Sequence, residues 1–189
     1  MKTPLVSLIT VSLNSEKYIE HTILSVIYQT YRNIEYIIID AVSTDKTLEI
    51  INKYRNKIDV LISEKDKGIY DAMNKGIQYA NGDIIGIINS DDWLNLESIE
   101  KVVRKSMQSN SNLFVIHGNI LLHDANNNPN IIRKAKKHPL AKYFTTPFKH
   151  PAMFVSKSVY EHFGKFELNS GLAADYDFML RIMKENTDI

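Results

Sequence analysis

Short apolar runs of strand character alternate with stripes of apolar residues at helical spacing through the first half of the chain. Four runs rich in Ile and Val occupy residues 6–11, 34–39, 58–62 and 84–88. The first run is followed by Ile19, Ile23, Val26 and Ile27, which share one face of a helix. Runs that are apolar throughout are typical of strands buried on both faces. The alternation therefore predicts βαβ units and a mostly parallel α/β sheet with helices on both sides.

Polar residues and a glycine mark the expected ends of these helices. Asn14 or Ser15 can cap the first helix, and Ser43 or Thr44 the second. The Asn81-Gly82 pair is expected to stop the third helix. A fourth helix is marked by Leu96, Ile99, Val103 and Met107.

The second half of the chain has a different pattern. Residues 113–122 form a long strand-like run, residues 124–130 an Asn-rich turn, and Ile131-Ile132 the return strand of a hairpin. Helices are expected at 156–163, closed by Gly164, and at 173–184. The small basic run at 133–138 is expected to be a solvated loop, with a phosphate or membrane-surface contact as the alternative.

Charge and residue usage exclude several classes of protein. With 23 basic and 22 acidic residues the net charge is only +1, which argues against a nucleic-acid-binding protein. The chain has no cysteine, so disulfide scaffolds, thiolate zinc sites and cysteine nucleophiles are excluded. No apolar run has the roughly 20 residues that a membrane span needs. The chain passes from Met1 directly into a strand-like run, and we therefore expect a cytoplasmic protein without a signal peptide.

Three common site motifs are also missing. No Gly-x-Gly-x-x-Gly follows a strand, and no Walker loop or Gly-x-Ser-x-Gly elbow occurs. The six histidines show no zinc spacing. The remaining chemical signal is a set of carboxylates.

Acidic residues follow the predicted strands at the edge where parallel sheets bind ligands. Asp40 ends the second run, Asp66 follows the third, and Asp91 and Asp92 follow the fourth. Two adjacent carboxylates can bind Mg²⁺ or Mn²⁺ and leave positions open for phosphate oxygens. The alternative is that Asp91 or Asp92 caps the next helix and that Asp40 is a turn residue.

Four linked motifs in this order resemble family 2 glycosyltransferases. They are Val6-Ser7-Leu8-Ile9-Thr10, the segment from Asp40 to Asp45, the segment from Asp66 to Gly76, and Asn89-Ser90-Asp91-Asp92-Trp93. His150-Pro151 through Phe154 and Ala173-Ala174-Asp175-Tyr176-Asp177 resemble the family's acceptor-side segments. The resemblance covers nearly the whole chain. It implies a GT-A fold, which is a Rossmann-like, mostly parallel central sheet flanked by helices, with a smaller acceptor-side half.

The resemblance also assigns roles to the carboxylates. The implied donor-binding residues are Thr10, Val11, Ser12, Asp40, Asp66 and Asp91, with Asp40 accepting a hydrogen bond from a uracil N–H. Asp92, together with Asp91, would bind Mn²⁺ or Mg²⁺ carrying the diphosphate. Asp175 would be the base that deprotonates the acceptor hydroxyl in an inverting transfer. The alternative for Asp175 is a first-turn helix acid, like Asp177.

The implied protein transfers one sugar from a nucleotide sugar, with UDP as the expected carrier. The acceptor would be a saccharide or lipid-linked saccharide in bacterial surface glycan synthesis, handled in the cytoplasm with possible peripheral contact to the inner face of the membrane. Residues 1–93 would be the donor half and residues 94–189 the acceptor half, with a C-terminal truncation as one reading of the end at Ile189.

Three departures from the family pattern leave an alternative open. Leu13 stands where an aromatic residue is common, Met73 where an arginine is common, and Ala174 where a glutamate precedes the base. Lys75 could replace the missing arginine. Met73 and Ala174 favour a non-catalytic nucleotide-sugar-binding module. A nucleotidylyltransferase would need a Gly- and Arg-rich loop after the first strand, which residues 12–15 lack, and a receiver domain fits the second half poorly. No Gln-x-x-Arg-Trp motif occurs, which argues against a processive synthase.

Overall fold

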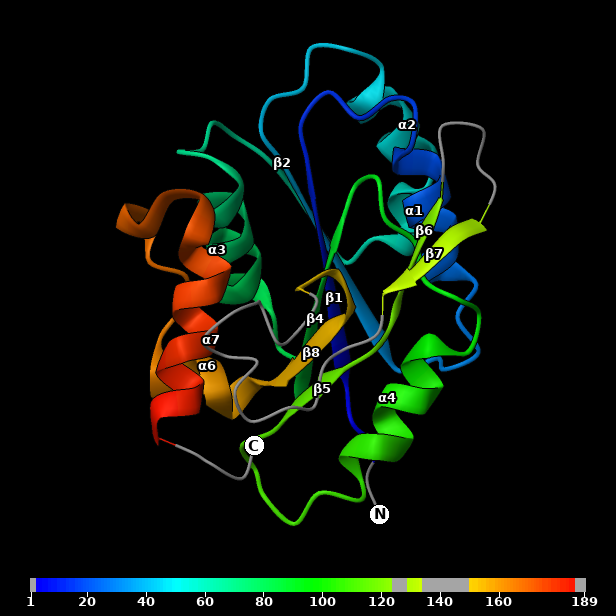
Figure 1. Cartoon of the computed structure of the whole chain (residues 1–189). Helices are drawn as coiled ribbons and strands as arrows, with labels where there is room; N and C mark the ends of the chain where they lie inside the picture. The colour runs from blue at the N-terminus through cyan, green and yellow to red at the C-terminus, as the bar shows by residue number, and fades with distance from the viewer. Residues whose placement is uncertain (1–2, 124–128, 134–149, 186–189) are drawn as a thin grey trace.

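The four strand-like runs of the first half lie side by side in one sheet, as predicted. The structure, a computed structural model, describes residues 3–123, 129–133 and 150–185. The sheet has the order β3 (Val60–Ser63), β2 (Ile34–Asp40), β1 (Val6–Ser12), β4 (Ile84–Asn89), β8 (Met153–Ser156) and β5 (Val115–His117). The first four strands are parallel, and β8 runs antiparallel to both of its neighbours. The mostly parallel α/β architecture is therefore confirmed (Figure 1).

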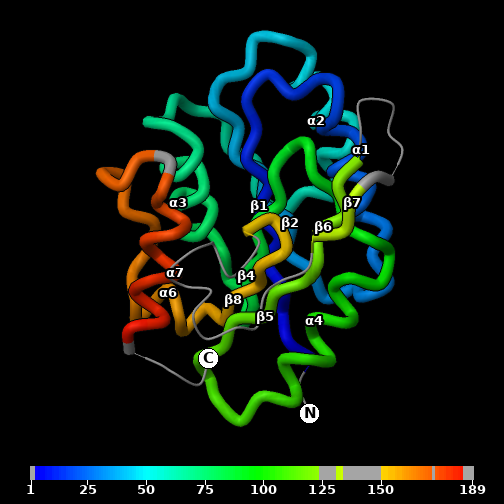
Figure 2. Tube along the Cα trace, in the orientation of Figure 1, coloured from blue at the N-terminus to red at the C-terminus, as the bar shows by residue number. Residues whose placement is uncertain are grey.

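Helices cover both faces of this sheet (Figures 1 and 2). One face packs against α1 (Ile19–Ile27), α2 (Thr47–Lys53) and α4 (Ser98–Ser106), and the other against α3 (Ile69–Tyr79), α6 (Lys157–Phe163) and α7 (Ala174–Glu185). Side chains alternate between the two cores, so that Leu8 belongs to the first and Ile9 to the second. Short 3-10 helices lie at Arg55–Lys57 (η1), His150–Ala152 (η2) and Leu168–Ala173 (η3).

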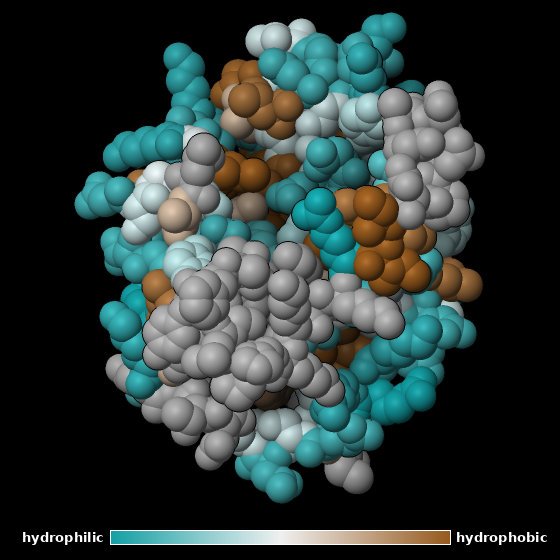
Figure 3. Space-filling model, viewed as in Figure 1, coloured by the Kyte–Doolittle hydropathy of each residue, from teal (hydrophilic) through white to brown (hydrophobic). Residues whose placement is uncertain are grey.

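A separate two-stranded hairpin consists of β6 (Ile120–His123) and β7 (Pro129–Arg133). The return strand was predicted correctly, but the single strand over 113–122 is wrong. Two strands replace it, separated at Gly118, whose N–H donates to the Ala152 carbonyl. The first, β5, belongs to the central sheet, and the second, β6, belongs to the hairpin. Figure 3 shows apolar atoms gathered over this hairpin, where Leu121, Ile131 and Ile132 are exposed.

Two further parts of the second-half prediction lie largely outside the described residues. They are the Asn-rich turn, of which residues 124–128 are not described, and the basic run after Arg133. Within the described ranges, no helix combines the length and the apolar composition needed to cross a membrane.

Several local predictions about the ends of helices and strands were wrong. The residue before α1 is Tyr18 and the residue before α2 is Lys46, and neither makes a side-chain cap. The predicted cap residues bind elsewhere, as the site below shows. Leu96 and Met107 lie outside α4 and are exposed, whereas Ile99 and Val103 are buried as expected. The third strand begins two residues later than predicted, at Val60.

The two C-terminal helices agree with the prediction. Gly164 follows α6 with a positive φ of 78°, which suits a glycine at a helix end. Phe178 and Ile182 of α7 are buried in the core that α3 also lines. Strand β8 was missed, because a run of only four residues has too little periodicity to stand out.

Candidate active site

The carboxyl ends of β1, β2, β3 and β4 meet at one edge of the sheet. In the strand register Ser12 pairs with Asp40, Asp40 with Ser63, and Val11 with Asn89. The predicted donor-binding residues Thr10, Val11 and Ser12 are all buried at this edge. The structure thus brings the end of β1 and Asp40 together.

The Asp40 carboxylate is fully buried and accepts hydrogen bonds from three serines. Ser12 Oγ donates to Oδ1 at 3.1 Å and Ser63 Oγ to Oδ2 at 2.8 Å. Ser43 donates through its N–H to Oδ2 at 3.0 Å and through its hydroxyl to Oδ1. A carboxylate has about four acceptor positions, so these bonds occupy Asp40. A nucleobase N–H would have to share or replace one of them.

The loops after β1 and β2 are tied to each other rather than to their own helices. The N–H of Asn14 donates to Ser43 Oγ at 2.9 Å, and the N–H of Thr44 donates to Asn14 Oδ1 at 2.9 Å. Ser15 binds Ser90 Oγ at 2.6 Å. This is why Asn14, Ser15, Ser43 and Thr44 do not cap the helices as predicted.

One residue of the second loop adopts a strained backbone. Val42 has a φ of 60°, which is unusual for a β-branched residue, and its side chain is 42% exposed. Leu13, the first residue of the loop after β1, is 58% exposed. Strained residues often occur at functional sites. Leu13 and Val42 are thus two exposed apolar side chains, in the loops that follow β1 and β2 at this edge.

Asp91 and Asp92 lie in the turn that follows β4. Asn89 Nδ2 donates to Asp92 Oδ2 at 3.0 Å, and the N–H of Asp92 donates to the Asn89 carbonyl. Burial, and next the charge of Asp91, raise the pKa of Asp92. Helix α4 begins only at Ser98, so the alternative in which Asp91 or Asp92 caps this helix is wrong.

The residues of this turn fit a hard divalent cation. Asn89 Oδ1 is buried and has no hydrogen-bond partner among the described residues, and Asp92 carries a charge that burial and Asp91 disfavour. Both features are relieved by a cation, and carboxylate and amide oxygens are suitable ligands for Mg²⁺ or Mn²⁺. Within the described residues no three His, Cys, Asp or Glu side chains gather as a metal site. A cation here would therefore also need oxygen ligands from a bound diphosphate or from water.

Trp93, next to these carboxylates, lies between two histidines. Its indole stacks on His21 at 5.6 Å between ring centroids and meets His123 edge-on at 5.0 Å. His123 ends β6, so the hairpin rests against the turn that carries Asp91 and Asp92. This contact joins residues that are far apart in the sequence, so no local pattern predicts it.

Asp66 lies in the loop between β3 and α3. Its Oδ1 accepts the N–H of Gly68 at 2.9 Å, and Gly68 has a φ of 113°. Asp66 thus supports the turn into α3. Lys75, considered as a replacement for the missing arginine, binds Glu64 at 2.8 Å and lies 3.6 Å from Asp71.

Asp175 stands in the first turn of α7, beside the start of α3. Burial, followed by the charge of the nearby Asp175 carboxylate, raises the pKa of Tyr70 to about 12. Burial lowers the pKa of His150, an effect that the charge of Asp175 opposes. Asp177 instead forms an ion pair with Arg181 at 3.0 Å on the same helix. Tyr70 and His150 lie in segments that resemble the family, but neither residue has a predicted role.

The departures from the family pattern at Met73 and Ala174 occupy buried positions. Met73 is 2% exposed and packs in the core under α3, and Ala174 is fully buried. An ionised side chain at either position would be costly to bury without a partner. Both substitutions are therefore consistent with the packing around them.

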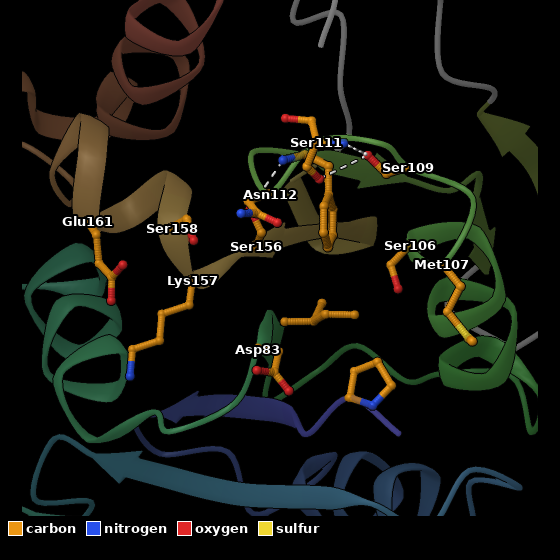
Figure 4. Close-up of a pocket in the computed structure, with 13 residues that line it drawn as sticks. Asp83, Ser106, Met107, Ser109, Ser111, Asn112, Ser156, Lys157, Ser158 and Glu161 are labelled. Atoms are coloured by element: carbon orange, nitrogen blue, oxygen red, sulfur yellow. Dashed lines mark hydrogen bonds between the residues drawn. The ribbon is translucent and has the colours of Figure 1, made fainter. Parts of the chain in front are cut away.

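A polar hollow of about 510 Å³ opens at the opposite edge of the sheet (Figure 4). Pro4 and Asp83, which line it, precede β1 and β4, so it lies away from the strand ends described above. Its serines mostly bind the nearby backbone; Ser156 Oγ, for example, accepts the N–H of Phe114. This hollow does not contain any of the predicted site residues.

Comparisons with known proteins agree with this architecture. The model of the family described as glycosyl transferase family 2 matches residues 7–164. An uncharacterized glycosyltransferase of Haemophilus influenzae is 37% identical over 131 residues, which cover 68% of this chain and 52% of that protein. TuaG of Bacillus subtilis, named for teichuronic acid biosynthesis, is 37% identical over 108 residues, covering 56% of this chain and 43% of that protein. The chain thus spans about half the length of these relatives.

Solved structures show the same fold at low sequence identity. S. aureus TarS residues 1–349 in complex with UDP has a TM-score of 0.77 and 22% identity, over 93% of this chain and 54% of that chain. The mannosyltransferase PcManGT of Pyrobaculum calidifontis, in complex with GDP-Man and Mn²⁺, has a TM-score of 0.72 and 18% identity, over 96% of this chain and 52% of that chain. Such neighbours are GT-A glycosyltransferases, so the predicted GT-A fold class is confirmed.

Proposed function

Because the chain belongs to glycosyl transferase family 2, we propose that it is an inverting, metal-dependent glycosyltransferase. It moves a single sugar from a nucleotide sugar, with UDP as the carrier, to a hydroxyl group of the acceptor. The observation that carries the proposal is the gathering of Asp40, Asp91 and Asp92 at the carboxyl edge of the parallel strands, the edge at which such sheets bind ligands.

In the proposed donor site, the buried end of β1 and Asp40 hold the nucleobase. Thr10, Val11 and Ser12 would line this subsite, together with Asp66. Val42 and Leu13 provide apolar surface next to it. Asp91 contacts the ribose or the sugar.

Asp92, Asp91 and the unpaired Asn89 Oδ1 would hold Mn²⁺ or Mg²⁺ together with the donor diphosphate. A bound cation would stabilise the negative charge that develops on the leaving nucleoside diphosphate. The raised pKa of Asp92 supports this assignment, because a half-buried carboxylate beside a second carboxylate gains from a neighbouring positive charge.

Asp175 acts as the general base in this proposal. It accepts the proton of the acceptor hydroxyl while the acceptor oxygen bonds to the anomeric carbon. The bond from that carbon to the phosphate oxygen breaks on the opposite face, and the nucleoside diphosphate leaves with the electron pair. One displacement of this kind inverts the anomeric configuration. A positioned base typically contributes about 10²–10⁴-fold to the rate.

We place the donor site in residues 1–93 and the acceptor site in residues 94–189. The proposed acceptor is a saccharide or lipid-linked saccharide of bacterial surface glycan synthesis, in line with the pathway in the name of the relative TuaG. The proposed location is the cytoplasm at the inner face of the membrane. The exposed Leu121, Ile131 and Ile132 of the hairpin would suit such a peripheral contact.

The test combines binding and turnover. The thermal midpoint is measured with UDP-glucose, UDP-GlcNAc and GDP-mannose, each with and without Mn²⁺, since ligands of the native state raise it by mass action. Release of the nucleoside diphosphate then reports turnover, and the anomeric configuration of the product is read by NMR. Retention of full transfer in both Asp92→Ala and Asp175→Asn would disprove the residue roles.

The alternative function is a non-catalytic nucleotide-sugar-binding module, favoured by Ala174 at the position before the base. It predicts that a nucleotide sugar raises the thermal midpoint while no nucleoside diphosphate is released. Turnover by the wild-type chain would remove this alternative.

A further inference from the structure

Helix α1 and the residues directly after it present a row of polar side chains to the loop between β4 and α4. Thr22 and Ser25 lie three residues apart on one face of α1, and Gln29 follows the end of the helix. Thr22 is fully buried and Gln29 is 1% exposed. Burying a polar side chain is costly unless it is hydrogen-bonded, so each of these side chains needs partners within the fold.

Ser25 and Gln29 hold the far part of this loop. Ser25 Oγ accepts the N–H of Leu94 at 3.2 Å. Gln29 Nε2 donates to the Asn95 carbonyl at 2.8 Å, and Gln29 Oε1 accepts the N–H of Ile99 at 3.1 Å. Ile99 lies in the first turn of α4, and the residue before this helix makes no side-chain cap. Gln29 therefore serves as the cap of α4.

Thr22 holds the part of the loop that carries the two carboxylates. Its hydroxyl donates to the Asp92 carbonyl at 2.8 Å and to the Ser90 carbonyl at 2.9 Å. A hydroxyl has one hydrogen to donate, so this hydrogen is shared between two carbonyls on either side of Asp91. Because both acceptors are backbone oxygens, Thr22 fixes the turn without using the carboxylates of Asp91 and Asp92.

A second contact reaches the same turn from the loop after β1. Ser15 Oγ and Ser90 Oγ lie 2.6 Å apart and form a hydrogen bond. The N–H of Ser15 in turn donates to Thr47 Oγ1 at 2.7 Å, and Thr47 is fully buried at the start of α2. The turn after β4 is thus attached to both α1 and α2.

The proposed cation ligands depend on the path of the backbone through this turn. Asn89 Nδ2 donates to Asp92 Oδ2 at 3.0 Å, so the two side chains already lie close together. Asn89 is the last residue of β4, and Asp92 follows three residues later. The relative position of their oxygens is therefore set by the intervening backbone, which Thr22 binds at Ser90 and at Asp92.

We infer that Thr22 is a positioning residue, which together with Ser15 holds the turn of Asp91 and Asp92 in the shape that binds the cation. This inference rests on the proposed function, because it takes Asp92 and Asn89 as ligands of Mn²⁺ or Mg²⁺. The Thr22 hydroxyl acts through the backbone and contacts neither the cation nor the donor. Its removal should therefore weaken cation binding and leave binding of the free nucleotide unchanged.

The experiment uses Thr22→Val, which removes the hydroxyl and nearly keeps the shape of the side chain. Circular dichroism first establishes that the variant is folded. The dissociation constant of Mn²⁺ is then measured by electron paramagnetic resonance of the free ion, with saturating UDP present. Residues that orient metal ligands typically change metal affinity by about 10–100-fold, so we expect Mn²⁺ to bind at least roughly tenfold more weakly. The affinity for UDP without Mn²⁺, measured by calorimetry, should equal that of the wild type.

Two control variants separate this role from a loss of stability. Thr22→Ser keeps the hydroxyl and should keep the Mn²⁺ affinity of the wild type. Ser7→Ala removes another fully buried hydroxyl at the opposite edge of the sheet, where Ser7 Oγ accepts the N–H of Gly82 at 2.8 Å. It should lower the urea unfolding midpoint, as Thr22→Val does, but leave Mn²⁺ binding unchanged.

Ser15→Ala provides a second test at a position that is only half-buried. The variant removes the contact with Ser90 Oγ and should also weaken Mn²⁺ binding. The effect should be smaller than in Thr22→Val, because Thr22 still binds the backbone of the turn. If Thr22→Val does not fold, Ser15→Ala decides the question.

Three results would overturn the inference. They are wild-type Mn²⁺ affinity in a folded Thr22→Val variant, an equal weakening in Thr22→Ser or Ser7→Ala, and, where Thr22→Val does not fold, wild-type affinity in Ser15→Ala. A wild-type chain that does not bind Mn²⁺ with UDP, or an Asp92→Asn variant that binds it as tightly as the wild type, would instead overturn the cation site of the proposed function. The two failures are therefore distinguishable.

Discussion

Gly76 of α3 faces Ile9 of β1 so closely that a Cβ on the glycine would lie 2.3 Å from Ile9 Cγ2. Ile9 is fully buried in the centre of the sheet, between β2 and β4. The absence of a side chain at residue 76 therefore sets how closely α3 approaches the sheet. This approach also places the start of α3, with Tyr70, beside Asp175.

We predict that Gly76→Ala destabilises the protein. Alanine is the better helix former by roughly 1 kcal/mol, but overpacking a close-packed core typically costs about 1–3 kcal/mol. The 2.3 Å contact makes the second effect the larger. The urea unfolding midpoint should fall, whereas Gln78→Ala on the exposed side of α3 should leave it unchanged or raise it. A stabilised Gly76→Ala variant would mean that α3 can move away from the sheet at little cost.

A second prediction concerns the strained loop after β2. Val42 has a φ of 60°, and its side chain is 42% exposed. A residue held in such a conformation costs about 1–3 kcal/mol, while the extra freedom of glycine in the unfolded chain costs about 0.4–1 kcal/mol. Val42→Gly should therefore raise the free energy of unfolding by about 1 kcal/mol.

Ala41→Gly is the matched control, because Ala41 is the neighbouring residue and does not have a positive φ. It should lower stability slightly. If Val42 also contacts the donor as proposed, Val42→Gly should weaken nucleotide-sugar binding while the fold becomes more stable. Equal loss of stability in both variants would count against backbone strain at Val42.

The sequence predicted the parallel strands because their residues are buried on both faces. Ile9 and Leu8 belong to different cores, so the run that contains them is apolar throughout and easily recognised. The same logic failed for β8, a four-residue strand that reaches the sheet only by pairing with β4 and β5. That pairing joins distant parts of the chain and leaves no periodic signal.

The positions of the strand-end carboxylates were also predictable, but their partners were not. Local rules assign Ser43 to a helix cap, whereas it binds Asp40 three residues earlier. Ser12 and Ser63 bind the same carboxylate from neighbouring strands. The free-energy cost of burying a carboxylate without hydrogen-bond donors exceeds the modest stabilisation from a helix cap. Tyr70 and Asp175 likewise meet only after the chain has folded.

A third prediction concerns acid stability at the edge of the sheet opposite to the active site. Burial acts to raise the pKa of Glu35, but hydrogen bonds from Ser7 and Asn81 together outweigh it, so the pKa lies below the ordinary value of 4.5. Ser7 is fully buried, and its Oγ also accepts the N–H of Gly82 at 2.8 Å. A lowered pKa means that the native state favours the charged carboxylate.

The stabilisation from Glu35 should therefore be fully present above pH 4.5 and be lost as the pH falls through the lowered pKa. Urea unfolding of wild type and Glu35→Gln across this range checks it: the wild type should be the more stable at neutral pH, and the difference should shrink in acid. Glu49→Gln, on the exposed side of α2, should show no such convergence. A difference that is constant with pH would contradict the assignment.

The last prediction concerns Mn²⁺ at the turn after β4. Burial and the charge of Asp91 raise the pKa of Asp92, so the pair of carboxylates should gain from a cation. Mn²⁺ added with UDP should raise the thermal midpoint of the wild type more than UDP alone. A ligand present at 100 times its dissociation constant stabilises the native state by about 2.7 kcal/mol. The Mn²⁺ increment should be lost in Asp92→Asn and be kept in Glu161→Gln, which alters the polar hollow at the opposite edge.

The pH dependence separates this site from weak surface binding of the cation. Asp92 must be deprotonated to bind a metal, and its raised pKa means that protons compete with Mn²⁺ at a higher pH than at an ordinary aspartate. The Mn²⁺ increment should therefore decline in mild acid before the fold itself unfolds. If the increment in Asp92→Asn equalled that of the wild type at every pH, Mn²⁺ would be bound elsewhere, and Asp92 would have no part in holding the donor.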